Sequence, residues 1–235
     1  MGYQRYFEHI SKLLNEIMVQ EESAIHAAAD IVADTIMKGS IVQAFGSGHS
    51  RAAAMEISQR AGGLVPVKLL DEPSQGRYEK VKGVGTMYMQ EVDARPGDCF
   101  IIISNSGSNP LPIEIASCAK KAGCRVIAVT AKEIANQHEG VHLHDLADAV
   151  LDLHSCEGDA AMEVEGVRSK VCGTSSVCAD VLLNSVMLEA IEKMVSQGFE
   201  PPVLLSGNVE GGMEYGRQLV MRYMDRLLRN HTYYY

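Results

Sequence analysis

Two short loops rich in glycine and serine carry the residues best suited to bind an anion. The first, "GSGHS", spans residues 46–50 and contains, around His49, the small residues Gly46, Ser47, Gly48 and Ser50. Glycine lets the backbone approach a ligand closely, and the N–H groups at the start of a helix carry partial positive charge. Serine hydroxyls add further donors. This combination predicts a site for a phosphate group.

The second loop, "SNSGSN" at residues 104–109, offers the same chemistry again. Its candidate binding residues are Ser104, Asn105, Ser106, Gly107 and Ser108. Either loop taken alone is equally well explained as a polar turn whose serines cap a helix. Two such loops, each between an apolar strand and a helix, make that explanation much weaker. Hydroxyls crowded into both loops suit one compact phosphomonoester.

A dinucleotide site is the alternative for the first loop, because "GSGHSR" partly matches the G-x-G-x-x-G fingerprint. Asp71 also stands where an acidic residue would bind the ribose. However, Arg51 replaces the third glycine, and its side chain would obstruct packing of the helix on the strand. A dinucleotide also gives no reason for the second loop. We therefore expect no cofactor.

The elements around these loops alternate between apolar strands and helices. Strands are predicted on the apolar runs "IVQAF", "LVPVKLL", "CFIIIS", "RVIAVT" and "AVLDL". Between and after them, helices are predicted over residues 50–61, about 77–91, 111–122 and about 174–197. This alternation predicts a parallel sheet covered by helices on both faces. Ligands of such sheets bind beyond the carboxyl ends of the strands, where both loops lie.

Helices are predicted at both ends of the chain, over residues 3–38 as a pair and near 213–229. We expect one domain with a helical extension (1–40), an α/β core (41–200) and a C-terminal loop and helix (201–235). The N-terminal pair and the helix at 174–197 have wide apolar faces, more than one small sheet needs to cover itself. They predict an oligomer, a homodimer or homotetramer.

Charge and composition disfavour several classes of protein. The 235 residues have a formal net charge of −9, so local donors must hold any anionic ligand. No apolar run approaches the ~20 residues of a membrane span, and the charged N-terminus is unlike a signal peptide. The six cysteines form no C-x-x-C pair, as expected of reduced thiols. We expect a soluble cytoplasmic protein that binds neither nucleic acid nor membrane.

The strands and loops "IVQAFGSGHS" and "IIISNSGSNP" resemble the SIS (sugar isomerase) domain family of phosphosugar isomerases and phosphosugar-binding regulators. "GTSSVCADVLLN" at 173–184 is similar to the third conserved element of that family. The resemblance implies a flavodoxin-like, doubly wound α/β fold whose sites commonly borrow residues from a second subunit. It also implies that phosphate is bound by Ser104, Asn105, Ser106 and Thr174, with Ser47 and Ser50 touching phosphate or sugar.

The catalytic pair of phosphoheptose isomerases in that family has no counterpart here. Arg60 stands where their glutamate would be, and Asn184 and Val186 stand near the place of their histidine. Moving a proton between adjacent carbons of an aldose or ketose needs a general base and a general acid. His49 has the right intrinsic pKa and lies in the first loop. We therefore expect His49 to act on the sugar, assisted by Glu56 or by an acid of the 157–163 loop.

The expected function is a cofactor-independent aldose–ketose isomerase that acts on a phosphorylated sugar. The alternatives are a phosphosugar sensor without turnover, and a lyase or etherase for an amino-sugar phosphate. A metal site is conceivable at "HEGVHLHD", where His142, His144 and Asp145 lie close in sequence. With no cysteine or obvious fourth donor nearby, we expect a polar loop without a metal.

Overall fold

The computed structural model describes residues 1–228. Their centre is a five-stranded, all-parallel sheet with the strand order β2-β1-β3-β4-β5. The strands are β1 (Val42–Gly46), β2 (Val67–Leu69), β3 (Cys99–Ile103), β4 (Arg125–Thr130) and β5 (Ala149–Asp152). The order reverses at β1, so the chain winds first to one side and then to the other. The predicted α/β fold with a doubly wound parallel sheet is confirmed.

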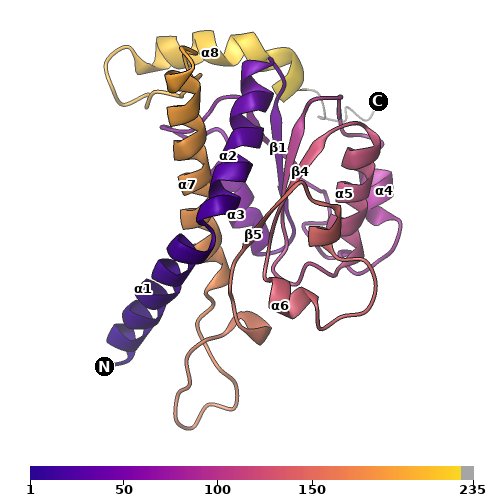
Figure 1. The fold of residues 1–235 in the computed structure, drawn as a ribbon, viewed down its shortest axis with the longest axis vertical. Coiled ribbons are helices and arrows are strands. Elements are labelled where there is room, and N and C mark those ends of the chain that lie inside the picture. Colours follow the sequence, from indigo (N-terminus) through magenta and orange to yellow (C-terminus); the bar gives the residue numbers. More distant parts are fainter. Residues whose placement is uncertain (229–235) are drawn as a thin grey trace.

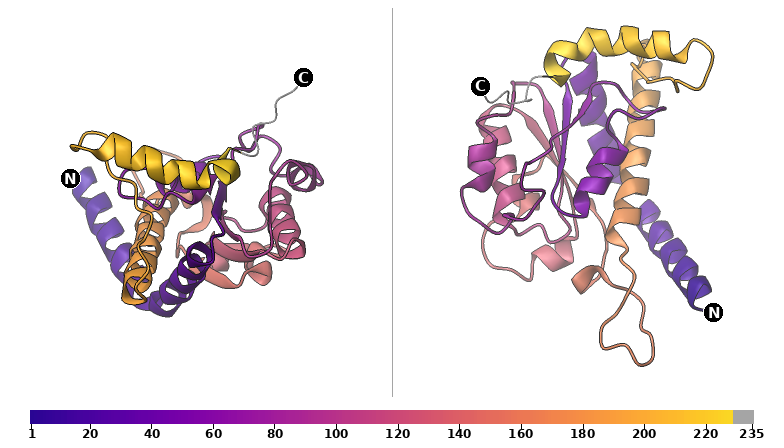
Figure 2. Two further views of the ribbon diagram at one scale, coloured as in Figure 1. Left: turned by 90° about the horizontal axis from the view of Figure 1, so that it is seen from above. Right: turned by 180° about the vertical axis from the view of Figure 1, so that it is seen from behind.

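Helices cover both faces of the sheet (Figure 1). One face carries α1 (Gly2–Gln20), α2 (Glu22–Met37), α3 (Ser50–Glu56) and α7 (Ser175–Ser196). The other carries α4 (Val84–Tyr88) and α5 (Pro110–Lys121), while the short α6 (Lys132–Ala135) follows β4. α8 (Gly212–Leu227) crosses the amino-terminal edge of the sheet, as the view from behind shows (Figure 2). Among the described helices none is long and apolar enough to cross a membrane.

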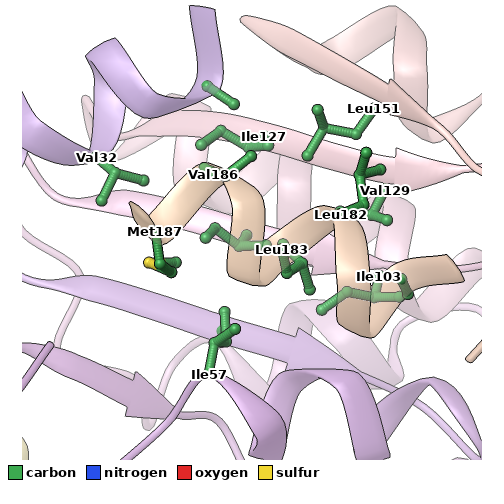
Figure 3. Packing of buried hydrophobic residues seen from close by; sticks show 14 of the residues in the cluster. Val32, Ile57, Ile103, Ile127, Val129, Leu151, Leu182, Leu183, Val186 and Met187 are labelled. Atoms are coloured by element: carbon green, nitrogen blue, oxygen red, sulfur yellow. The ribbon is translucent and has the colours of Figure 1, made fainter. Parts of the chain in front are cut away.

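The core follows from the alternation of side chains along each strand. Ile101 and Ile103 of β3 point toward α2 and α7, whereas Phe100 and Ile102 point toward α5, and all four are buried. Strands covered on both faces need apolar residues at every position, which is why "CFIIIS" has no polar alternation. The α7 side of this core packs Leu182, Leu183, Val186 and Met187 onto Ile127, Val129 and Leu151 of the sheet (Figure 3).

Two predicted helices are shorter than expected. The helix predicted over 50–61 ends at Glu56. The helix predicted near 77–91 is reduced to α4, and turns replace its first part. Gly83, at the start of α4, has a φ of +92°, a left-handed conformation that breaks a continuous helix. Residues 77–83 are therefore free to turn back toward the carboxyl edge of the sheet.

A hairpin formed by residues 156–173 projects beyond that edge (Figures 1 and 2). An isolated antiparallel bridge between Met162 and Val171 joins its two sides. α1 holds its base: the Tyr6 hydroxyl donates to the carbonyl of Gly173 at 2.7 Å, and Arg5 Nη1 donates to the carbonyl of Glu163 at 3.2 Å. This 156–173 hairpin connects β5 to α7 and so lies next to both predicted loops.

Candidate functional site

Both predicted loops line one pocket of about 460 Å³ at the carboxyl ends of β1 and β3. The first loop contributes Ser47, Gly48, His49 and Ser50, and the second contributes Ser104, Asn105, Ser106, Ser108 and Asn109. Further walls come from segments distant in sequence: Glu79, Lys80, Ile134, His138, Gly158, Asp159 and Ser175. The structure thus brings the two loops together as the sequence predicted.

The first loop depends on two glycines for its shape. A Cβ on Gly46 would lie 2.3 Å from the carbonyl oxygen of Ser50, so any larger residue would push the start of α3 away. Gly48 has a φ of +55° in the turn that follows. The backbone nitrogen of Gly48 lies so close to Gly76 that a Cβ added to Gly76 would come within 2.7 Å of it. Gly46 and Gly48 therefore position the loop, while Ser47, His49 and Ser50 present their side chains around it.

The second loop is fixed by backbone hydrogen bonds from three sides. The N–H of Ala131 donates to the carbonyl of Asn105 at 3.1 Å, and the N–H of Leu143 donates to that of Gly107 at 2.8 Å. Gly107 has a φ of +59°, and an added Cβ would lie 2.5 Å from Thr130 Oγ1. Ser155 also donates its hydroxyl to Asn105 Oδ1 at 2.5 Å. The loop is rigid before any ligand arrives.

The serines of this loop divide into two kinds. Ser104 is buried, and its hydroxyl oxygen accepts the N–H of Gly107 at 3.3 Å, so it supports the loop. The hydroxyls of Ser106 and Ser108 hydrogen-bond to no group within residues 1–228, although both residues line the pocket. These two hydroxyls, together with Lys80, which lines the same pocket, form a set of donors suited to an anion.

Glu79 connects the two loops, and the sequence reasoning missed it. Its Oε2 accepts the hydroxyl of Ser47 at 2.6 Å, and its Oε1 accepts Asn109 Nδ2 at 3.0 Å. The N–H of Leu111 donates to its carbonyl at 3.0 Å. The predicted helix over 77–91 would have placed Glu79 on a helix face. The glycines on either side, Gly76 and Gly83, were the available signal for a turn.

A second carboxylate, that of Asp159, lies on the opposite wall at the N-terminus of α7. Asp159 Oδ1 accepts the N–H groups of Thr174 at 3.0 Å and of Ser175 at 2.8 Å, and the Thr174 hydroxyl at 3.3 Å. Its Oδ2 accepts the Ser175 hydroxyl at 2.6 Å. Thr174 is therefore beside the pocket, but both of its donors are directed at Asp159.

The residues predicted to act on the sugar, His49, Glu56 and the acids of the 157–163 loop, lie at different distances from the pocket. His49 is exposed on the pocket rim. Glu56 is not among the residues that line the pocket; it pairs with Arg60 and accepts Asn184 Nδ2 at 3.5 Å. Within a single chain Glu56 is thus directed away from the two loops, because α3 turns its side chain toward α7. Of the acids in the 157–163 loop, only Asp159 lines the pocket.

The cysteine on the first turn of α7, Cys178, is buried in the core and does not line the pocket. Burial, with a smaller contribution from the charge of Asp159, raises the pKa of Cys178 to about 11. Its thiol therefore stays protonated at neutral pH, and a thiolate nucleophile is not available there. The chemistry of the pocket rests on hydroxyls, carboxylates, one lysine and the two histidines His49 and His138.

His142, His144 and Asp145 form the one group within residues 1–228 whose side chains could share a metal ion, with ligand atoms within 4.8 Å of one another. The two imidazole rings are stacked at 5.1 Å with an interplanar angle of 7°. A single ion cannot lie in the planes of two stacked rings, so binding would need one ring to rotate. His142 Nε2 also lies 2.8 Å from the carbonyl of His138. The arrangement favours a hydrogen-bonded loop over a metal centre.

Three kinds of comparison place the chain among known proteins. A family described as SIS domain matches residues 5–131. A UPF0309 protein of Listeria monocytogenes is 45% identical over 227 residues, covering 94% of this chain and 97% of the relative. A UPF0309 protein of Halalkalibacterium halodurans is 36% identical, covering 94% of each chain.

Solved structures share the fold at low sequence identity. The phosphoheptose isomerase of Neisseria gonorrhoeae superimposes with a TM-score of 0.59 at 17% identity, covering 81% of this chain and 97% of that one. The Vibrio vulnificus NanR protein, complexed with ManNAc-6P, superimposes with a TM-score of 0.56 at 13% identity, covering 97% of this chain and 70% of that one. By its match to the family over more than half its length, and by its relatives, this chain belongs to the SIS domain family.

Proposed function

We propose that the pocket binds a phosphorylated sugar through its phosphate group. The observation that carries this proposal is the convergence of two glycine–serine loops on one pocket, where the hydroxyls of Ser106 and Ser108 have no hydrogen-bond partner among residues 1–228. Lys80 adds a positive charge at a pocket wall of a protein whose net charge is −9. Membership of the SIS domain family, and the names of the solved structures that share the fold, support the same ligand class.

We further propose that the bound sugar is isomerised between aldose and ketose forms without a cofactor. A base removes the C2 proton of the aldose to give an enediol, and a proton is returned to C1 while another moves between the two oxygens. Among the titratable residues that line the pocket, we assign the acid and base roles to His49 and Glu79. Ser47 and Asn109 hold the Glu79 carboxylate between the two loops, so it reaches a ligand bound by both.

A sensor without turnover is the second candidate. It is favoured by the surroundings of α7, where Arg60 pairs with Glu56 and where Arg60 and Asn184 stand near the expected places of the glutamate and histidine of phosphoheptose isomerases. A lyase acting on an amino-sugar phosphate would use the same pocket, with Glu79 or His49 as the base. Heavy-water exchange separates the sensor from both enzymes, because only an enzyme labilises a carbon-bound proton.

We also propose that the protein is a homodimer or homotetramer. α7 is buried on one side, yet it exposes Val177, Val181 and Leu188 on the other. α1 exposes Phe7 to 68% of its full area. A second copy of the chain would cover both helices, and Glu56 lies beside α7, where such a copy would bring it a new neighbour. Light scattering at micromolar concentration should give a mass above the 25.5 kDa of one chain.

The test of turnover uses two substitutions on the same pocket. Wild-type protein is screened by thermal shift against triose to heptose phosphates, since a ligand that binds only the native state raises the melting temperature. The best ligand is then incubated in heavy water, and the C2 proton is followed by NMR. Removal of a general acid or base lowers the rate by about 10²–10⁴-fold. We expect that loss from His49→Asn or Glu79→Gln, with ligand affinity changed far less.

The control for this experiment is Glu165→Gln, which removes one exposed carboxylate outside the pocket. Its exchange rate should equal that of the wild type. Binding without exchange in the wild type would reject the isomerase and leave the sensor. Full exchange in both pocket variants would reject His49 and Glu79 as the acid and base.

A further inference from the structure

Asp159 occupies donors that an anion in the pocket would also use. Its two carboxylate oxygens take the N–H groups of Thr174 and Ser175 and both of their hydroxyls. Ser175 and Asp159 line the same pocket as Ser106 and Ser108. A phosphate group bound by the second loop and a carboxylate fixed on the opposite wall would repel each other across this space.

The backbone that carries Asp159 is in an unfavourable conformation. Asp159 has a φ of +47°, and the preceding Gly158 has a φ of +73°. Left-handed conformations are unfavourable for a residue with a side chain, and they persist only where surrounding contacts hold them. The hydrogen bonds to Thr174 and Ser175 are those contacts. Release of the carboxylate would therefore let the backbone at 158–159 relax.

The segment that would move is attached at few points. Within the 156–173 hairpin, Ala161 donates to the carbonyl of Cys172, and Met162 and Val171 exchange both of their backbone hydrogen bonds. Within residues 1–228, its hydrogen bonds to the rest of the molecule come from Tyr6 and Arg5 of α1 and from Asp159 itself. Val164 and Val167 near the tip are exposed rather than packed on the domain. Asp159 is thus the link between the hairpin and the pocket.

We propose that Asp159 is an internal competitor for the phosphate of the ligand, and that the 156–173 hairpin is released when the ligand displaces it. This inference rests on the proposed function, because it needs a phosphate-bearing ligand in the pocket. In the absence of ligand, Asp159 closes the N-terminus of α7. The apparent affinity of the ligand is then reduced in proportion to the fraction of molecules in which Asp159 has moved away.

The test compares phosphate binding by three proteins. Inorganic phosphate and glucose 6-phosphate are titrated by calorimetry into the wild type, Asp159→Asn and Glu165→Gln. Asparagine keeps the size of the side chain but loses its charge, whereas Glu165→Gln removes one charge from the tip of the same hairpin. We expect Asp159→Asn to bind inorganic phosphate about tenfold more tightly, and Glu165→Gln to stay within twofold of the wild type.

Three outcomes overturn the proposal. Equal or weaker binding by Asp159→Asn would show that the carboxylate supports the site instead of competing for it. Equal gains in Asp159→Asn and Glu165→Gln would assign the effect to net charge alone. Binding of neither probe by any of the three proteins would reject the proposed function together with the competitor, whereas the first two outcomes leave phosphate binding intact.

A measurement on the wild type covers the case in which Asp159→Asn does not fold. Hydrogen exchange is followed with and without inorganic phosphate on peptides that contain the amides of Ala161, Met162 and Val171. Displacement of Asp159 removes one anchor of the hairpin, so these amides should exchange faster when phosphate is bound. Slower or unchanged exchange at saturating phosphate would overturn the proposal.

Discussion

Asp98 at the amino edge of the sheet and the second-loop serines at the carboxyl edge differ in how many hydrogen bonds their side chains make. At the amino edge, the buried Asp98 accepts hydrogen bonds from Ile41, Gln43, Arg95 and Arg226. At the carboxyl edge, the hydroxyls of Ser106 and Ser108 reach a pocket without a partner among the described residues. Saturated polar groups hold a structure together, while unoccupied ones are available to a ligand. We therefore expect the amino edge to control stability and the carboxyl edge to control binding.

The largest effect is expected at the amino edge. Arg226 of α8 is buried, and its Nη2 lies 2.6 Å from Oδ2 of the fully buried Asp98. Removal of one partner of a buried ion pair costs about 3–5 kcal/mol, because the other charge stays behind unpaired. Arg226→Met should lower the free energy of unfolding, measured in urea, by that amount. Affinity for the sugar phosphate should be unchanged at low temperature, where the variant is folded.

The matched control for Arg226→Met is Arg217→Met on the same helix. Arg217 is exposed and pairs with Glu214 at 3.0 Å, so its loss should cost less than about 1 kcal/mol. The comparison between the two edges would fail if Arg226→Met left stability intact, or if the folded variant had lost the ligand.

The second effect belongs to the carboxyl edge. Hydrogen bonds to a charged group contribute about 1.5–3 kcal/mol each. Loss of two in Ser106→Ala/Ser108→Ala should weaken binding of a sugar phosphate by at least about a hundredfold, as measured by calorimetry. Ser104 is left in place because its hydroxyl supports the N–H of Gly107. The melting temperature should stay near that of the wild type.

Ser117→Ala on α5 serves as the control for this pair, because Ser117 lies outside the pocket. Undiminished binding by the double variant would mean that the ligand does not use the second loop. A large fall in melting temperature would mean that this loop, like the amino edge, contributes mainly to stability.

The smallest effect is a change of stability with pH. Burial lowers the pKa of Lys68 from 10.5 to about 8. Between these values the unfolded state binds more protons than the folded state, so Lys68 contributes more to stability as the pH rises. The free energy of unfolding of the wild type minus that of Lys68→Met should therefore increase from pH 7.5 to 9.5. Buried thiols such as Cys99 are present in both the wild type and Lys68→Met. Their contribution to the pH dependence of stability therefore cancels when the two free energies are subtracted.

Lys38→Met is the control for the pH series, since Lys38 is exposed and pairs with the exposed Asp34 at 3.5 Å. Its difference from the wild type should stay constant over the same range. A constant difference for Lys68→Met would show that the Lys68 ammonium is hydrated in the folded protein.

Local sequence patterns predicted much of the fold. The run "RVIAVT" forms β4 with the expected bounds, because five consecutive buried positions after the exposed Arg125 leave little choice of structure. The two loops were predicted for the same reason, since each depends on glycine and serine within six residues. The sequence did not predict that Glu79 joins the loops, or that Asp159 takes the donors of Thr174. Both depend on turns whose direction is set by contacts between segments far apart in the chain.

The packing of α2 against α7 has a consequence for how the chain is made. Ala28, Val32 and Ile36 of α2 are buried in the same cluster as Leu183 and Val186 of α7, and the two helices are in contact. On the ribosome α2 emerges early, and α7 follows about 140 residues later, which is roughly 7–28 s at ordinary rates of synthesis. During the first part of that interval, until residue 103 has been added, β1 also has no β3 to pair with. The apolar face of α2 in the nascent chain therefore stays exposed to water until the last third of the chain has been translated. This is the stage at which binding of a chaperone would protect the chain most.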